Sequence, residues 1–295
     1  MPNIGFIGLG NMGGPMAANL VKSGGPVLGF DVVAALREAS AADGVQIVGN
    51  ARQCVENADV VITMLPAGEH VVAVWKDVVP AAKPGTLFID CSTIDVASAR
   101  AAHALAGQHG VVSLDAPVSG GVGGAKAATL TFMVGGTADA FARGKPVLER
   151  MGKRVVHCGE AGNGQVAKIC NNMILGVSMI AVSEAFVLGE RLGLSHQALF
   201  DVASASSGQC WSLTSYCPVP GPVPASPANN GYKPGFAAAL MLKDLKLAKK
   251  AARSVKADTD LGGRAAEIYE SFAQAGESGT DFSGIINFVR GRMRE

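Results

Sequence analysis

The sequence has little charge, and its charges nearly cancel. Of 295 residues, 25 are lysine or arginine and 24 are aspartate or glutamate, which gives a formal net charge of +1. Nucleic acids and anionic membrane surfaces are usually bound through a basic stripe or a run of like charge. We therefore expect a small molecule as partner, with no nucleic acid and no membrane.

The cysteines lack the spacings of a metal site or a disulfide framework. The six lie at positions 54, 91, 158, 170, 210 and 217, with no Cys-x-x-Cys pair and no histidine at ligand spacing. Such scatter is typical of reduced thiols in a reducing compartment. We expect no bound metal and a cytoplasmic location. The first predicted strand begins almost at Met1, which leaves no room for a cleavable leader segment.

No apolar run reaches the length of a membrane span. The longest, from Met173 to Val182, is interrupted by Gly176 and Ser178, whereas a span needs about 20 apolar residues. Hydrophobic residues make up 48% of the chain, an ordinary globular balance. A chain of this length is expected to form two domains.

The chain begins with a complete nucleotide-binding pattern. A short strand at 3–7 runs into Gly8-Leu9-Gly10-Asn11-Met12-Gly13, a helix follows with Pro15 in its first turn, and a second strand at 26–30 ends at Asp31. The acid follows Gly8 by 23 residues, close to the spacing of about 20 in dinucleotide-binding motifs. This order of strand, glycine turn, helix, strand and acid predicts a dinucleotide site.

Each part of this pattern has its own physical role. Gly8 permits the tight turn, Gly10 lets the backbone approach a pyrophosphate, and Gly13 lets helix and strand pack closely. The phosphates would lie at the helix start, beside Asn11 and Met12. Asp31 would accept hydrogen bonds from ribose hydroxyls and repel a 2′-phosphate. Since residues 32–34 include no arginine, NAD is predicted rather than NADP.

Two further strands bring side chains to the same edge of the predicted sheet. The run 59–65 is almost wholly apolar, as in a parallel strand buried on both faces, and 87–90 is a similar strand. Ligands of open parallel sheets bind beyond the carboxyl ends of the strands. Leu65, Pro66 and Thr93 occupy such ends and are candidate cofactor contacts, with ordinary strand-to-helix turns as the alternative.

The rest of this half contains a glycine-rich loop. Strands at 112–115, 130–134 and 155–158 and a helix at 139–151 are expected to complete the sheet. Ser119 precedes four glycines within five residues, starting with Gly120 and Gly121. Backbone amides left uncovered by glycine can surround an anion, although the same pattern also fits a flexible turn.

The second half has helical periodicity throughout most of its length. Residues 164–191 lack proline and predict one helix of about 42 Å. It carries Lys168 and Asn172 on one face, since i and i+4 are neighbours on a helix. If that face meets a nicotinamide ring, the pair is a proton-transfer site; otherwise it is a solvated lysine beside an asparagine.

The remaining helices are expected near 195–204, 243–256, 261–275 and 283–292. The stretch 212–235 contains six prolines, which predicts a rigid and largely non-helical loop near the mouth of the site. We therefore predict an α/β Rossmann-type N-terminal domain over 1–162, and an all-α C-terminal domain over 163–295 joined to it by the long interdomain helix.

Four segments, in order along the chain, carry a family resemblance. They are Gly8 to Asn19, Asp115 to Gly121, Gly162 to Asn172, and Phe236 followed by Leu242-Lys243-Asp244-Leu245. Together they closely resemble the cofactor, substrate, catalytic and lysine motifs of the 3-hydroxyisobutyrate dehydrogenase branch of the β-hydroxyacid dehydrogenase family. Cys210-Trp211-Ser212 is similar to that branch, although Gln209 stands where relatives commonly have arginine.

The resemblance implies a function and a set of roles. It implies NAD-dependent oxidation of 3-hydroxyisobutyrate to methylmalonate semialdehyde, and homodimers or homotetramers built through the helical domain. Lys168 is then the catalytic acid–base group, and Asn172 orients the substrate. Ser119, with Gly120 and Gly121, binds the carboxylate, Trp211 forms an apolar wall, and Phe236 and Lys243 support the cofactor side.

Two alternatives remain open at this point. A reductase of glyoxylate, tartronate semialdehyde or succinic semialdehyde in the same family would share every catalytic part. A catalytically silent NAD-binding scaffold would keep the fold alone. The retention of Lys168, Asn172 and Ser119 together argues against the scaffold.

Overall fold

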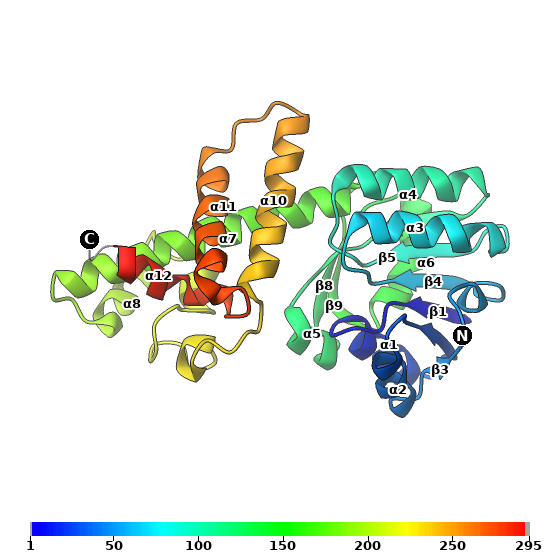
Figure 1. Ribbon diagram of the computed structural model, residues 1–295, viewed down its shortest axis with the longest axis horizontal. Helices are drawn as coiled ribbons and strands as arrows, with labels where there is room; N and C mark the ends of the chain where they lie inside the picture. Colours follow the sequence, from blue (N-terminus) through cyan, green and yellow to red (C-terminus); the bar gives the residue numbers. More distant parts are fainter. Residues whose placement is uncertain (1, 293–295) are drawn as a thin grey trace. The chain divides into compact units, whose positions relative to one another are not determined.

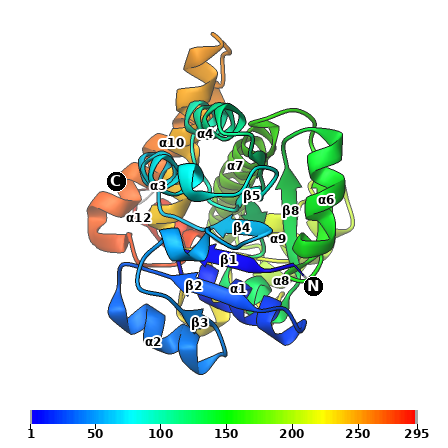
Figure 2. The same ribbon diagram turned by 90° about the vertical axis from the view of Figure 1, so that its right-hand side faces the viewer.

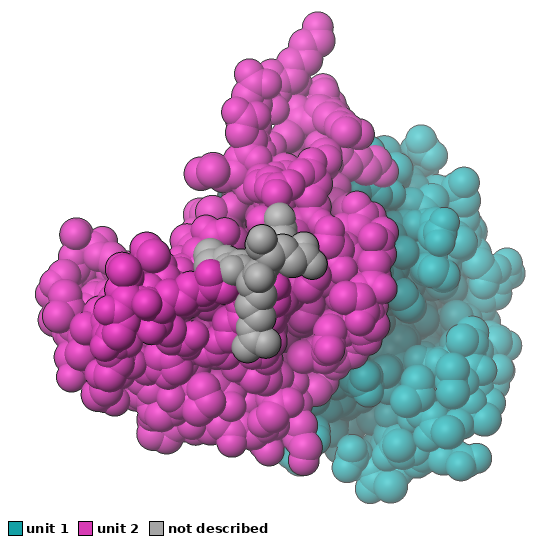
Figure 3. All heavy atoms as spheres, turned by 60° about the vertical axis from the view of Figure 1, so that its left-hand side comes forward, with its two compact units in different colours: residues 1–168 teal, residues 169–295 magenta. Residues whose placement is uncertain are grey.

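The computed structural model describes residues 2–292 and divides into two compact units, Met1–Lys168 and Ile169–Glu295. Figure 3 shows the first in teal and the second in magenta. The division falls inside helix α7 (Asn163–Arg191), whereas the sequence predicted a boundary just before that helix. Met1 and residues 293–295, which the predicted domain ranges include, lie outside the described residues.

Unit 1 is built on a parallel sheet of six strands. They are β1 (Ile4–Ile7), β2 (Val27–Phe30), β3 (Gln46–Ile47), β4 (Val60–Thr63), β5 (Leu87–Asp90) and β6 (Val112–Asp115). Their order, β3-β2-β1-β4-β5-β6, is the order of a dinucleotide-binding Rossmann sheet. The predicted α/β fold of this half is therefore confirmed.

Helices cover both faces of this sheet. They are α1 (Gly13–Lys22), α2 (Ala34–Ala42), α3 (Gly68–Val78), α4 (Val96–Gln108), α5 (Gly121–Ala127) and α6 (Ala138–Leu148). In Figures 1 and 2, α3 and α4 lie on one side of the sheet and α1 and α2 on the other. Trp75 and Phe88 centre the core under α3 and α4, whereas Phe6 and Met16 belong to the core on the other face.

Of the three strands expected to complete the sheet, 112–115 does so as β6, whereas 130–134 and 155–158 lie in another sheet, so that part of the prediction is wrong. β7 (Val118–Ser119), β8 (Leu130–Val134) and β9 (Gly152–His157) form a separate three-stranded sheet. The chain leaves β6 through Pro117, which has no amide hydrogen, and β7 then pairs antiparallel with β8. One isolated bridge, between Asp115 and Gly135, links the two regions. The glycine loop is also shorter than expected, because α5 already begins at Gly121.

Unit 2 is helical, as predicted. Besides its part of α7 it contains α8 (His196–Ser204), α9 (Trp211–Thr214), α10 (Ala238–Ser254), α11 (Asp260–Phe272) and α12 (Ile285–Arg292). α10 begins five residues earlier than the sequence indicated. The proline-rich stretch is largely non-helical, with only α9 and the short 3-10 turn at Pro227–Asn230. Its residues Cys217 and Val219 are buried against Phe186 and Val187 of α7, so this segment is part of the core.

α7 differs from the expectation that no segment is long and apolar enough to span a membrane. By length and composition the whole helix is long and apolar enough to cross a membrane, although its central run alone is not. Of its most apolar window, 44% is buried inside the protein. Met179, Ile180, Phe186 and Val187 fill the two cores of unit 2, a role that requires the same apolar composition.

Candidate active site

The turn between β1 and α1 requires glycine for several different reasons. Gly8 has a φ of +96°, which other residues adopt only with strain. A Cβ on Gly13 would lie 1.9 Å from the carbonyl oxygen of Gly8, so no side chain fits where the helix meets the turn. A Cβ on Gly10, by contrast, would have no atom within 4 Å. The backbone at Gly10 is therefore open to a close approach, as a pyrophosphate requires.

The start of α1 is also suited to an anion. Met12 precedes the helix and provides no side-chain cap for its first amides. Amides without a side-chain cap and the positive end of the helix dipole favour a phosphate at this position. Asn11 is exposed and Met12 half-buried at this helix start. The residues present thus fit a bound dinucleotide.

The carboxylate that ends β2 is fixed by the glycine turn. Asp31 Oδ2 accepts a hydrogen bond from the Leu9 amide at 2.7 Å, and Oδ1 accepts one from the Val33 amide at 2.8 Å. Arg37 donates from α2 to the Asp31 carbonyl oxygen at 2.6 Å, and its guanidinium lies 5.8 Å from the ring centre of Phe30. The sequence prediction missed this arginine, because α2 returns it to Asp31 from six positions away.

A buried network joins the ends of β4 and β5. Thr63 Oγ1 donates to Asp90 Oδ1 at 2.8 Å, and Ser92 Oγ donates to the same oxygen at 2.6 Å. Ser92 Oγ also accepts from the Leu65 amide at 2.7 Å, which fixes the turn into Pro66. Burial raises the pKa of Asp90 to about 6, since the enclosed carboxylate loses its hydration. The other oxygen, Oδ2, has no hydrogen-bond partner among the described residues.

The segment around Thr93 is held by the first turn of α7. Gln165 is fully buried. Its Nε2 donates to the Ser92 carbonyl oxygen at 2.8 Å, and its Oε1 accepts from the Ile94 amide at 3.1 Å. Thr93 therefore lies between two backbone groups that Gln165 holds.

Lys168 and Asn172 lie in one helix, as predicted, with exposed fractions of 6% and 2%. At i and i+4 they share a face of α7. The helix start is fixed in unit 1, where Asp115 accepts from the amides of Gly162 at 2.8 Å and Gln165 at 2.9 Å. Lys168 follows Gln165 by less than one turn, so its backbone position is set by these bonds.

The predicted carboxylate loop lies between β7 and α5. Ser119 ends β7, and Gly120 and Gly121 follow with φ angles of +129° and +60°. Asn19 of α1 donates to the Ala125 carbonyl oxygen of α5 at 2.7 Å. The helix after this loop is thereby tied to the helix after the dinucleotide turn, which explains the asparagine that ends the first motif.

In unit 2, Asn172 is bound to α10. Its Nδ2 donates to Asp244 Oδ2 at 2.5 Å, and its Oδ1 accepts from Asn171 Nδ2 at 3.0 Å. Asp244 is buried and directly follows Lys243, which is half-buried. Phe236 lies just before α10, with its ring 5.7 Å from that of Phe282 in an edge-to-face arrangement.

Trp211 is supported from one side and open on the other. Its ring stacks on Tyr216 at 4.9 Å and 20°, while 51% of the residue is exposed. The Tyr216 hydroxyl donates to Asp281 Oδ2 at 2.9 Å. Burial raises the pKa of Tyr216, and the neighbouring carboxylate raises it further. Tyr216 therefore stays neutral and keeps this hydrogen bond.

The predicted site residues divide between the two units. Unit 1 holds Gly8, Gly10, Asn11, Met12, Gly13, Asp31, Leu65, Pro66, Thr93, Ser119, Gly120, Gly121 and Lys168, and unit 2 holds Asn172, Trp211, Phe236 and Lys243. The sequence prediction assigned no role to Asp90, Asp115 or Gln165. One signal was present in the sequence, because Asp90 and Asp115 each end a predicted strand. In the structure the two residues are register partners on β5 and β6.

Comparisons with known proteins cover the whole chain. The model of the NAD-binding domain of 6-phosphogluconate dehydrogenase matches residues 3–159. A model described as the NAD-binding of NADP-dependent 3-hydroxyisobutyrate dehydrogenase matches residues 162–289. These two models together account for both units.

Named relatives match at full length. A probable 3-hydroxyisobutyrate dehydrogenase of Mycobacterium tuberculosis is 56% identical over 292 residues, 99% of each chain. The 3-hydroxyisobutyrate dehydrogenase of Pseudomonas aeruginosa is 49% identical, over 99% of this chain and all of the relative. A solved structure of M. tuberculosis 3-hydroxyisobutyrate dehydrogenase with L-serine superposes with a TM-score of 0.96 at 56% identity, covering 98% of this chain and 99% of that one. The chain belongs to the 3-hydroxyisobutyrate dehydrogenase family.

Proposed function

We propose that this protein is an NAD-dependent dehydrogenase that reversibly oxidises 3-hydroxyisobutyrate to methylmalonate semialdehyde, a step of valine degradation. The observation that carries the proposal is the buried Lys168, on a helix whose start is bonded to the carboxyl ends of a Rossmann sheet. Ligands of such sheets bind at those ends. The names of the full-length relatives support the choice of substrate.

Lys168 is the acid–base group of this mechanism. Bound NAD supplies the hydride acceptor. The neutral amine of Lys168 takes the hydroxyl proton during oxidation, and its ammonium returns the proton during reduction. Asn172 orients the substrate. An ionised Asp244 only accepts hydrogen bonds, so the Asn172 nitrogen is assigned to it and the amide oxygen keeps one acceptor site for the substrate hydroxyl.

The substrate carboxylate binds at the Ser119 loop. The Ser119 hydroxyl and the amides of Gly120 and Gly121 are the donors, and an anion removed from water needs several of them. Lys243 and Phe236 support the cofactor or the substrate anion. Trp211 provides the apolar wall for the methyl group of hydroxyisobutyrate.

NAD is preferred over NADP in this proposal. Asp31 is held at the end of β2 by two backbone amides, so its charge stays where a 2′-phosphate would bind. The Arg37 guanidinium donates to the carbonyl oxygen of Asp31 and is engaged by this hydrogen bond. Steady-state kinetics with both cofactors test this preference, and an equal or higher kcat/KM with NADP contradicts it. The pair Asp31→Asn and Val32→Arg is expected to narrow the gap, since Val32 is 84% exposed.

A substrate panel followed at the reduced-nicotinamide absorbance tests the activity. It contains 3-hydroxyisobutyrate, 3-hydroxypropionate and L-serine for oxidation, and glyoxylate, tartronate semialdehyde and succinic semialdehyde for reduction. The Lys168→Ala protein is the control for contaminating dehydrogenases. The highest kcat/KM is expected with 3-hydroxyisobutyrate. Preference for one of the other aldehydes favours the reductase alternative, and no turnover at all favours the silent scaffold.

L-Serine is the second candidate substrate. It has the same 3-hydroxy acid frame, with an ammonium in place of the methyl group, and one similar structure was solved with it. An apolar wall at Trp211 favours the methyl group over an ammonium. The ratio of kcat/KM for the two acids decides between them.

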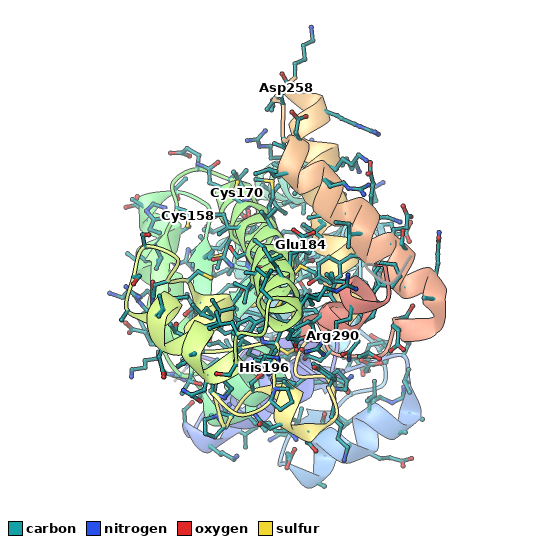
Figure 4. All side chains as sticks on the ribbon, turned by 90° about the vertical axis from the view of Figure 1, so that its left-hand side faces the viewer. Cys158, Cys170, Glu184, His196, Asp258 and Arg290 are labelled. Carbon is teal, nitrogen blue, oxygen red and sulfur yellow. The ribbon has the colours of Figure 1, made fainter. Side chains whose placement is uncertain are left out.

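We further propose a cytoplasmic homodimer or homotetramer that assembles through unit 2. The six free thiols are suited to a reducing compartment. A groove of about 400 Å³ lies between α7, α11 and α12, and it is lined mainly by apolar residues together with Glu184 and Arg264. Figure 4 labels Glu184 on α7. Ile174 and Leu261 add apolar surface on α7 and α11, at 65% and 73% exposed.

Opposite charges in one groove allow a two-fold pairing, in which Glu184 of one copy faces Arg264 of the other. Light scattering coupled to size exclusion measures the assembly. Glu184→Arg and Arg264→Glu are each expected to weaken it, and the double exchange to restore it. A wild type that is monomeric at micromolar concentration contradicts the proposal.

A further inference from the structure

Asp115 begins the predicted substrate motif, but its side chain is bonded to the start of the catalytic helix. Its Oδ1 accepts from the Gly162 amide at 2.8 Å, and its Oδ2 accepts from the Gln165 amide at 2.9 Å. The side chain is 2% exposed. Asp115 belongs to the last strand of the main sheet, so the helix start is bonded directly to that strand.

A histidine of another helix, His103, also bonds the Asp115 carboxylate. His103 of α4 places Nε2 at 2.9 Å from Asp115 Oδ1, and its Nδ1 lies 2.7 Å from Ser113 Oγ. A carboxylate accepts only, which assigns the proton to Nε2 and lets the Ser113 hydroxyl donate to Nδ1. Ser113, His103 and Asp115 are connected in the order of a hydrolytic triad, and Asp115 also accepts from two backbone amides at the start of the helix. These contacts point to a structural support.

The junction has no room for a side chain at two glycines, Gly135 and Gly164. A Cβ on Gly164 would lie 2.4 Å from the Met133 carbonyl oxygen and 2.8 Å from Asp115 Oδ2. A Cβ on Gly135 would lie 2.4 Å from Asp115 Oδ1 and 2.9 Å from the Asn163 amide nitrogen. The helix start and the Asp115 carboxylate are thus packed directly against each other, which explains both glycines. A displacement of Asp115 is therefore expected to move the first turn of α7.

Gln165 extends this support to the other side of the turn. Its side chain bonds the backbone before and after Thr93, while its amide bonds Asp115. One residue therefore links the catalytic helix to the ends of β5 and β6 together. Lys168 follows three residues later, with only 6% of its surface exposed.

We propose that His103, Asp115 and Gln165 are positioning residues that set the place of the Lys168 amine. This inference rests on the proposed acid–base role of Lys168. None of the three needs to touch the substrate. Proton transfer requires the amine within about 3 Å of the reacting hydroxyl, and a misplacement of about 1 Å can cost roughly 100-fold in rate.

His103 is the residue to vary, because it supports the carboxylate without forming the fold of the turn. His103→Ala is expected to lower kcat for hydroxyacid oxidation roughly 10-fold, with KM and the Kd for NAD within about two-fold of wild type. His103→Gln should recover most of the loss, since its amide nitrogen can replace Nε2 as donor to Asp115. His109→Ala, at the exposed end of the same helix, is the matched control and should leave kcat unchanged.

Hydrogen exchange without substrate provides the second measurement. The amides of Gly162 and Gln165 are protected by Asp115, so a peptide covering 160–170 should exchange faster in His103→Ala, remain slow in His103→Gln and stay unchanged in His109→Ala. Asp115→Asn replaces one acceptor oxygen by a donor and should accelerate the same peptide still more. A peptide from α1 should be unchanged in every variant.

The two measurements separate the possible outcomes. Faster exchange together with a lower kcat supports the inference. Faster exchange with an unchanged kcat overturns it, because the helix start then moves without displacing the amine. Unchanged exchange in His103→Ala also overturns it. If the wild type oxidises no hydroxyacid, the proposed function fails, and exchange alone still decides whether His103 holds the helix.

Discussion

Both units use an aspartate to hold backbone amides, but the amides differ in their distance along the chain. In unit 1, Asp31 accepts from the amides of Leu9 and Val33, 22 and 2 residues away, at the glycine turn of the dinucleotide motif. In unit 2, Asp281 accepts from the Gly235 amide, 46 residues away, and from the Tyr216 hydroxyl, 65 residues away. Unit 1 therefore positions its dinucleotide turn through contacts that have a local sequence signature. Unit 2 positions Trp211 through packing that has no such signature.

The largest effect is expected in unit 1. Lys168→Ala removes the proposed general acid–base group and should lower turnover by roughly 10²–10⁴. NAD binding should stay nearly intact, because the dinucleotide turn and Asp31 are separate from α7. In the wild type, oxidation should speed up with rising pH over the range in which the amine deprotonates, since only the neutral form accepts a proton. Stopped-flow kinetics and NAD titration measure these effects.

Lys168→Arg is the informative companion variant, because it keeps a cation that does not deprotonate. It should be as slow as Lys168→Ala in oxidation. Near-native turnover in either variant is incompatible with the role assigned to Lys168. The acid–base group would then have to be a residue outside unit 1.

The next effect lies in unit 2 and concerns stability. Asp281 is fully buried and accepts from Tyr216, from the amides of Gly235 and Phe236, and from both donors of Ser283. Asp281→Asn turns one acceptor oxygen into a donor and leaves buried donors unsatisfied. The free energy of unfolding should fall by about 2–4 kcal/mol.

Chemical denaturation measures this loss, with the exposed Asp258→Asn as control in the same unit; Figure 4 labels Asp258. Asp258→Asn should change the free energy by less than about 0.5 kcal/mol. A loss below 1 kcal/mol for Asp281→Asn would show that unit 2 does not depend on this carboxylate, and the contrast between the units would disappear.

A third prediction concerns Asp90 in unit 1. Because burial raises its pKa to about 6, the folded protein binds this proton more tightly than the unfolded chain does. Unfolding releases the proton between about pH 4 and pH 6, so this group makes stability fall as the pH rises through that window. The contribution is on the order of 2–3 kcal/mol. The Tm of wild type minus that of Asp90→Asn should decline from pH 4 to 6 and level off above.

Glu190 of unit 2 is the control, because its contribution to stability should change with pH in the opposite direction. The hydrogen bond from Arg290 lowers the pKa of this carboxyl, so its contribution is present at neutral pH and lost as the pH falls. His196 bonds the same carboxylate, and Figure 4 labels His196 and Arg290. Glu190→Gln should therefore lose stability mainly at neutral pH. A Tm difference for Asp90→Asn that rises with pH would contradict the assignment.

The sequence predicts most of unit 1 because its site depends on backbone geometry. Gly8 and Gly13 are required by a positive φ and by a close contact, and such needs leave a fixed spacing in the sequence. The second sheet was missed because Pro117 and the glycines after Ser119 fit either a loop or a short strand and helix. Strand pairing between β7 and β8 is non-local, and the pattern of either strand alone does not reveal it.

The supports of the site could not be predicted for a related reason. His103 and Asp115 are 12 residues apart, and Gln165 and Ser92 are 73 apart. Nothing in the spacing of such pairs indicates that they meet. Arg37 was missed although it is only six residues from Asp31, because the contact between them depends on the direction in which α2 leaves the strand. Motifs predict which residues bind ligands, whereas the residues that hold those candidates in place are found only in the fold.

The smallest effect concerns substrate discrimination by Trp211. One methyl group in an apolar pocket is worth about 1–3 kcal/mol, and a wall that is half exposed should give the low end of that range. Trp211→Ala should therefore lower kcat/KM for 3-hydroxyisobutyrate about 5–10-fold more than for unbranched 3-hydroxypropionate. Ser119→Ala should weaken both acids equally, since both carry the carboxylate. Tyr216→Phe keeps the ring that stacks on Trp211 but removes the hydrogen bond to Asp281. It therefore distinguishes the effect of the Trp211 wall from the effect of the Asp281 support. Equal losses for both acids in Trp211→Ala would mean that unit 2 does not recognise the methyl group, and substrate choice would then belong to unit 1 alone.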